Sequence, residues 1–206
     1  MSLSENLTGL RTLLRTDLGE PSEGRWADGD LDRHVGHGIR DLNRVAPREM
    51  KATDLTIADP ASRAIDISSL ADLINVIAVE YPVGAHPRRL RHFECWGTTL
   101  TLLTDTMPVA GASIVVFYTA PHVVDADGST LPSHLEEVVL VGAAGYAALE
   151  YATYTSDRVN VGDRTPEQFR AFGNDCLMQF RQELTALKRE RSHALRMGEL
   201  WTEDER

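Results

Sequence analysis

The stretch from Ser133 to Tyr154, SHLEEVVLVGAAGYAALEYATY, constrains the fold of this chain more than any other. Ser133 and Glu136 have the spacing of a helix capping box, and Pro132 prevents a helix from entering from upstream. The following residues are apolar or small on nearly every side of the predicted helix. A helix that is apolar on every side must be covered on every side.

The middle of this helix consists of glycine and alanine, which let neighbouring backbones approach closely. Each glycine weakens an isolated helix by about 1 kcal/mol relative to alanine, so packing must hold the segment in helical form. Two interpretations stay open: the helix is central to a bundle, or it meets another copy of itself. In both, the residues predicted to form the contact are Gly142, Ala143, Gly145, Tyr146 and Ala148.

Two further helices are predicted near the N-terminus from apolar residues at three- and four-residue steps. The first covers about residues 4–16, with Ser2 and Glu5 as a capping box. The second follows Asp28 as its N-cap and ends before Pro47.

The last predicted helix has a clear start and an open end. Thr165 is the predicted N-cap, Pro166 the first helical residue and Gln168 the third. Apolar residues follow at helical spacing, and the pattern weakens after Lys188. A helix continuing to Met197 would be about 48 Å long and would project beyond a domain of this size.

The segment between residues 50 and 120 has a different pattern. Short alternating runs, rich in β-branched residues and separated by turn residues, predict five or six strands at hairpin-like spacing. These strands are expected near residues 55–57, 64–67, 73–79, 90–96, 98–103 and 113–119. We therefore expect an α+β fold. Residues 1–49 and 121–206 form a four-helix bundle with a long projecting C-terminal helix, and residues 50–120 form a small antiparallel sheet or barrel inserted between the second and third helices.

Charge and composition narrow the classes of function. The chain has 31 acidic and 21 basic residues and a net charge of −10, which argues against a protein that coats nucleic acid. The opening MSLSENLTGLR has no basic and apolar regions of a signal peptide, and the most apolar run carries too many charges for a membrane span. Two cysteines fit no metal-binding spacing or disulfide framework and are expected as buried thiols.

Sequence patterns for catalysis are absent. The sequence has no GxSxG, GxxxxGK[ST], GxGxxG or HExxH motif. We therefore expect no enzymatic activity and no cofactor.

The segment after His122 is the main candidate for a metal site. Counting Asp125 as position one of a calcium loop, Asp127 takes position three and Glu136 position twelve. The required glycine at position six is replaced by threonine, and a proline stands at position eight. The Asp-x-Asp-Gly-Ser sequence is also typical of a tight turn, which is the favoured interpretation.

A second metal candidate is the pair His34 and His37. Their three-residue spacing places both on one face of the second helix, where two imidazoles can bind zinc. The favoured interpretation is two solvent-facing histidines.

Two surfaces could bind other molecules. Arg88, Arg89 and Arg91 form a local basic cluster that could contact DNA phosphates or an acidic partner, and otherwise form a solvated rim. The end of the last helix could present its apolar stripe to another protein. Its candidate docking residues are Leu184, Leu187, Arg189, Arg191, Leu195 and Trp201.

The layout resembles the head–tail connector, or adaptor, proteins of tailed bacteriophages. An opening helix is followed by a second helix that starts near Trp26-Ala-Asp28. The segment from Tyr118 through His122 to Pro132 then leads into an acidic helix start. A small-residue helix around Gly142–Ala148, a polar loop and a long phenylalanine-rich final helix complete the resemblance. The inserted 50–120 segment exceeds the minimal helical adaptors of this family.

The resemblance implies a ring of twelve subunits in the virion neck, assembled in the host cytoplasm. The ring would dock beneath the capsid portal protein, contact a downstream neck or tail protein and surround double-stranded DNA without reading its sequence. A stopper or tail-completion protein is the alternative within the same class, and a calcium- or zinc-binding module or enzyme is the alternative outside it.

Overall fold

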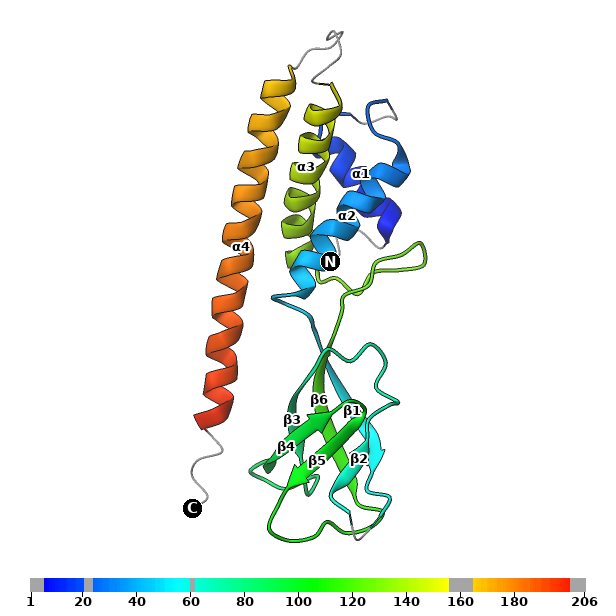
Figure 1. Cartoon of the computed structure of the whole chain (residues 1–206), viewed down its shortest axis with the longest axis vertical. Coiled ribbons are helices and arrows are strands. Elements are labelled where there is room, and N and C mark those ends of the chain that lie inside the picture. The colour runs from blue at the N-terminus through cyan, green and yellow to red at the C-terminus, as the bar shows by residue number, and fades with distance from the viewer. Residues whose placement is uncertain (1–5, 21–23, 60–61, 156–164, 201–206) are drawn as a thin grey trace. The chain divides into compact units, whose positions relative to one another are not determined.

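The computed structural model describes residues 6–20, 24–59, 62–155 and 165–200, with side chains up to residue 191 in the last helix. The chain forms two compact units. One consists of residues 1–46 and 122–193, and the other of residues 47–121 and 194–206. The fold is α+β, and the described residues form four helices and a curled antiparallel sheet of six strands (Figure 1).

The helices are α1 (Leu7–Asp17), α2 (Asp28–Asn43), α3 (Ser133–Thr155) and α4 (Pro166–Leu200). The capping box predicted for α4 is confirmed. The Gln168 backbone N–H donates to Thr165 Oγ1 at 3.3 Å, and the Thr165 N–H donates to Gln168 Oε1 at 2.8 Å. These bonds satisfy backbone groups that a helix start leaves without partners.

The caps predicted for the first two helices were wrong or lie outside the described residues. Ser2 and Glu5 are not described, and the observed N-cap of α1 is Asn6, whose side chain accepts from the Gly9 N–H at 3.0 Å. The N-cap of α2 is Ala27, so Asp28 is the first helical residue. Its carboxylate instead binds Arg15 of α1 at 2.6 Å, a tertiary contact that sequence spacing does not reveal.

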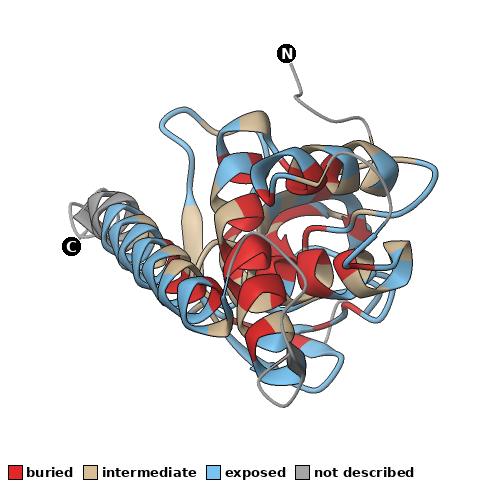
Figure 2. Ribbon diagram, turned by 90° about the horizontal axis from the view of Figure 1, so that it is seen from above, coloured by how far each residue is buried: buried red, intermediate tan, exposed pale blue. Residues whose placement is uncertain are grey.

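Helix α3 is covered within its own chain. Ala143 and Ala147 are fully buried in a hydrophobic cluster that includes Leu10 of α1, Leu31 of α2 and Phe169 of α4. Seen from above, the buried residues lie where the helices face one another (Figure 2). The same chain therefore covers most of this helix, although Glu137 and Glu150 are exposed and Val138 and Val141 are half-buried. Among the described residues, no helix combines the length and apolarity that crossing a membrane requires.

Glycine allows α3 and α4 to approach closely. A Cβ added to Gly142 would lie 2.9 Å from the Phe180 ring, and one added to Gly145 would lie 2.8 Å from Leu177. In the other direction, a Cβ on Gly173 would lie 3.0 Å from the Gly145 carbonyl oxygen. These distances are shorter than carbon atoms tolerate, so side chains of α4 occupy the space that glycine leaves open on α3.

The strands are β1 (Arg48–Thr56), β2 (Ala64–Asp66), β3 (Asn75–Glu80), β4 (Leu90–Trp96), β5 (Thr99–Leu103) and β6 (Ser113–Ala120). Their spatial order is β1-β6-β3-β4-β5-β2, and every pair is antiparallel. The first and last strands pair along their length, from Arg48 opposite Ala120 to Thr56 opposite Ser113. The chain therefore enters and leaves this unit through neighbouring strands, as an inserted segment requires.

The sheet has its own hydrophobic core. Most of β6 is buried, and Val79, Leu100 and Ile114 are fully buried in the same cluster. Sequence alternation located the strands near 64–67, 90–96, 99–103 and 113–119, but the prediction that the first strand began near Leu55 was wrong. Strand β1 begins at Arg48, because it pairs along β6 even where its own residues are polar and half exposed.

The close approach of α2 to α3 predicts opposite effects for two glycines of the same helix. A Cβ at Gly38 would lie 2.9 Å from the Val139 carbonyl oxygen, whereas a Cβ at Gly36 would have no neighbour within 4 Å. We expect Gly38→Ala to lower the free energy of unfolding by about 1–3 kcal/mol through overpacking. The matched control Gly36→Ala should raise it by about 0.5–1 kcal/mol through helix propensity. Urea titration measures both, and equal effects would contradict this packing.

Candidate interaction surfaces

Helix α4 contributes fewer fully buried side chains to the hydrophobic core towards its C-terminal end. Phe169 and Phe180 are almost fully buried, whereas Leu184 and Leu187 are half-buried at the edge of the helical core. Two of the predicted docking residues, Leu184 and Leu187, therefore pack against the helical core of their own chain. Of the other candidate docking residues, Arg189 is exposed and Arg191 is half-buried, the side chain of Leu195 is not described, and Trp201 lies outside the described residues.

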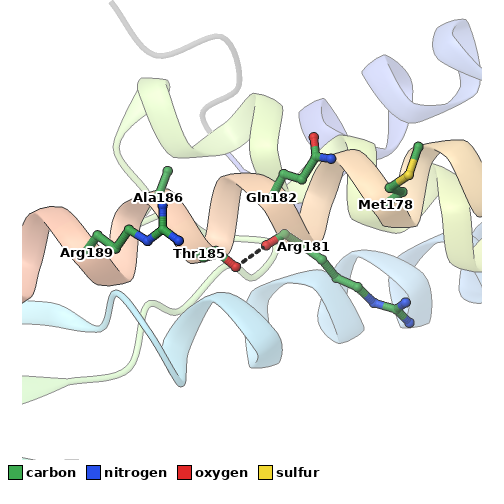
Figure 3. A pocket seen from close by; sticks show the side chains of 6 residues that line it. All are labelled: Met178, Arg181, Gln182, Thr185, Ala186 and Arg189. Carbon is green, nitrogen blue, oxygen red and sulfur yellow. Dashed lines mark hydrogen bonds between the residues drawn. The ribbon is translucent and has the colours of Figure 1, made fainter.

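The outward side of α4 forms the shallow hollow drawn in Figure 3. It is lined by Met178, Arg181, Gln182, Thr185, Ala186 and Arg189. All six belong to α4, and the Thr185 hydroxyl donates to the Arg181 carbonyl oxygen of the preceding turn at 2.7 Å. The Met178 side chain is 55 % exposed. We call these six residues the outer face of α4, a helix surface that no described part of the chain covers.

Of this outer face, the predicted docking residues include only Arg189. The other predicted positions mostly follow the apolar stripe that continues from Phe169 and Phe180, and that stripe faces the core. Met178 and Ala186 are apolar residues off the stripe, and they were the available indication of a second contact surface.

A polar network connects α2 with α3. His34 is only 2 % exposed, and its Nε2 lies 3.0 Å from Glu150 Oε2. The same carboxylate accepts from Arg33 Nη2 at 2.8 Å on both oxygens. Neither ring nitrogen of His34 has a well-aligned hydrogen bond, and burial lowers the pKa of His34 while the nearby Glu150 opposes that shift. The interpretation of His34 as solvent-facing was therefore wrong.

The network continues through the tyrosine predicted as a packing residue. His37 is half-buried, with its ring centroid 5.5 Å from that of Tyr146. The Tyr146 hydroxyl donates to Asp41 Oδ2 at 2.5 Å. Burial, followed by the hydrogen bond to Asp41, raises the pKa of Tyr146 to about 12, so the phenol keeps its proton and acts as a donor. These contacts fasten α2 to α3, and the two imidazoles pack edge to face at a centroid distance of 5.9 Å.

The predicted calcium ligands do not gather at one point. The Asp125 carboxylate accepts from the Asp127 and Gly128 N–H groups, both at 2.9 Å, which is the tight turn favoured from the sequence. His122 is buried, and its Nδ1 lies 3.1 Å from the Thr130 carbonyl oxygen. Glu136 is fully buried in α3. In the described parts of the chain, no three His, Cys, Asp or Glu side chains are close enough to hold a metal ion.

The basic cluster belongs partly to the internal structure of the sheet. Arg88 Nε lies 3.1 Å from Glu80 Oε2, and the Arg88 guanidinium lies 5.3 Å from the centre of the Phe117 ring. Arg91 Nε donates to the Tyr81 carbonyl oxygen at 2.8 Å. The exposed Arg89 side chain makes no hydrogen bond or ion pair with described residues. Arg89 is thus the member of the cluster most available to a phosphate or an acidic partner.

Comparisons with known proteins do not assign the chain to a family. No family model matches it, and the search of curated proteins found no significant match. Proposals about function therefore depend on the geometry described above and on the resemblance found in the sequence.

Burial of His34 predicts that acid destabilises the helical unit. The folded state lowers the pKa of His34 below its ordinary value of 6.5, so the unfolded chain binds more protons as pH falls past that value. Stability should therefore decline from pH 7 towards pH 5. Urea titrations across this range should show a weaker decline for His34→Gln than for the wild type. His134→Gln, at an exposed position of α3, is the control, and an unchanged slope for His34→Gln would contradict the assignment.

Proposed function

We propose that this protein is a structural subunit of a tailed-phage virion, which forms a connector ring between the capsid portal and the tail. The observation that carries the proposal is α4. It has 35 residues, about 52 Å of helix, and its outer face is covered by none of the described residues. A rigid helix fastened to a folded unit on one side is suited to joining one protein to another.

The chain's charge supports a position around DNA. With a net charge of −10, a ring of these subunits would repel the phosphate backbone, so DNA could pass without binding tightly. The family resemblance supplies the remaining details: twelve subunits, the portal protein on one side and a downstream neck or tail protein on the other. No catalytic step belongs to this function.

The proposal includes a four-helix bundle as the rigid body of each subunit. Its support is the shared hydrophobic cluster, to which α1, α2, α3 and α4 all contribute buried side chains. A rigid body of this kind would let a contact at one surface hold the orientation of the projecting helix.

The alternatives differ in their support. A calcium or zinc module gains none from the described residues, because the candidate donors do not converge on a common point. A stopper or tail-completion protein shares the virion location with a connector and differs from it in position along the neck.

Electron microscopy of purified virions tests the proposal. We expect a ring of density that fits the helical unit directly beneath the portal. The same density one layer further from the capsid would support the stopper alternative. Absence of this chain from the neck would contradict the proposal.

Removal of the helix end should separate folding from docking. Leu187 is the last apolar residue of α4 seen packing against the helical core. A chain that ends at Lys188 should therefore keep its thermal midpoint within about 4 °C, a change that corresponds to roughly 1 kcal/mol at this size. In virions that assemble with the truncated chain, occupancy of the neck should fall. Unfolding of the truncated protein would show that the end of α4 is part of the fold.

A further inference from the structure

Charged residues of α4 are separated onto two sides of the helix. At about 100° per residue, Arg170 and Arg181 point to one side of the buried stripe, and Glu183 and Glu190 point to the other. Arg189 continues the basic set, and Asp175 the acidic set, onto the side opposite the stripe. All six are exposed. We call these sets the basic flank and the acidic flank. Glu167, in the first turn of the helix, is an acidic residue on the basic side.

These charges lack partners in the chain described here. None of the six belongs to an ion pair with another described residue. Arg181 and Arg189 have no acidic residue three or four positions away, and Asp175 and Glu183 have no basic residue there. These four charges therefore do not stabilise their own helix through neighbouring turns, unlike the charged pairs of an ordinary solvent-exposed helix.

The acidic side extends beyond α4. Burial, followed by the negative charge of Glu137 on α3, raises the pKa of Asp17 at the end of α1. Asp17 and Asp175 both act on the Cys176 thiol, whose pKa is raised mainly by burial. These interactions place Asp17 and Glu137 on the same side of the helical unit as Asp175.

The two flanks match each other in spacing. Arg181 and Arg189 are eight residues apart, as are Asp175 and Glu183, which corresponds to about 12 Å along the helix. The two pairs therefore have the same separation along the helix and the same rotation around its axis. Met178 lies beside the basic flank and Ala186 beside the acidic flank, where they could exclude water from such a contact.

We propose that α4 binds a second copy of this chain head to tail, with the basic flank of one copy against the acidic flank of the next. This inference rests on the proposed connector function and names the contact between neighbouring subunits. Because the two halves of the contact lie on different sides of one helix, each copy can bind two neighbours. A contact of this type repeats, and it forms a ring where the rotation between neighbours closes.

Charge reversal on each flank tests the contact in the full-length protein. The basic-flank variant carries Arg181→Glu and Arg189→Glu, and the acidic-flank variant carries Asp175→Lys and Glu183→Lys. Sedimentation velocity at low ionic strength should show assembly of the wild type that added salt weakens. Each variant should bind its own copies about tenfold more weakly, since two attractive pairs become repulsive.

Restoration by compensation distinguishes this contact from a general effect of charge. A variant with all four reversals should assemble like the wild type, and an equimolar mixture of the two double variants should also assemble. The control Lys51→Glu, on the sheet, changes the net charge half as much as the basic-flank variant without touching α4, and it should leave assembly unchanged. Circular dichroism establishes that each variant retains its helices and its thermal midpoint.

Three results would overturn the inference: a wild-type chain that stays monomeric, a folded fourfold variant that does not assemble, and a closed dimer in place of a larger ring. Failure of the connector proposal would look different. If assembly changes with the charge reversals as predicted but the chain is absent from the virion neck, the connector proposal is rejected and the contact is retained. A ring in the neck whose assembly is unchanged by the charge reversals would reject the contact and retain the connector.

Discussion

The close packing of backbones around α3 is the constraint on which the helical unit depends. Gly142 and Gly145 leave space that Phe180 and Leu177 of α4 occupy, and Gly38 of α2 meets the Val139 carbonyl oxygen from another side. Side chains at these glycines would push the helices apart and open voids in a core that must be filled to near-crystalline density. The unfavourable helix propensity of glycine is thus offset by contacts that only a glycine permits.

This packing also determines which surfaces are left for other molecules. Because α4 turns its apolar stripe towards α3, its outer face and its two charged flanks face away from the core.

The sheet places a different demand on the chain. Strands β1 and β6 pair antiparallel, so the segment can be inserted between α2 and α3 while keeping a hydrophobic core of its own. The two units therefore need different sequence patterns, one with helical periodicity and one with alternation.

Much of the fold could be predicted from local patterns, whereas much of the candidate site could not. Thr165 and Gln168 form the expected capping box because both partners lie within one turn of helix. His34 was misjudged although Leu31 and Gly38 share its side of the helix, because only the approach of α3 buries that side. Arg88 is exposed, as expected for a solvated rim, but its contacts with Glu80 and Phe117 form only because the sheet brings these residues together.

The sequence by itself determined that a helix would span the Ser133 segment, that most of its residues would be covered, and that an antiparallel β unit would interrupt the helices. Only the tertiary structure decided that the cover comes from the same chain, through Leu177 and Phe180, and that the flanks of α4 remain exposed. The physical reason is that periodicity reports which side of an element is apolar. The identity of the surface that meets it depends on how closely two backbones distant in sequence can approach.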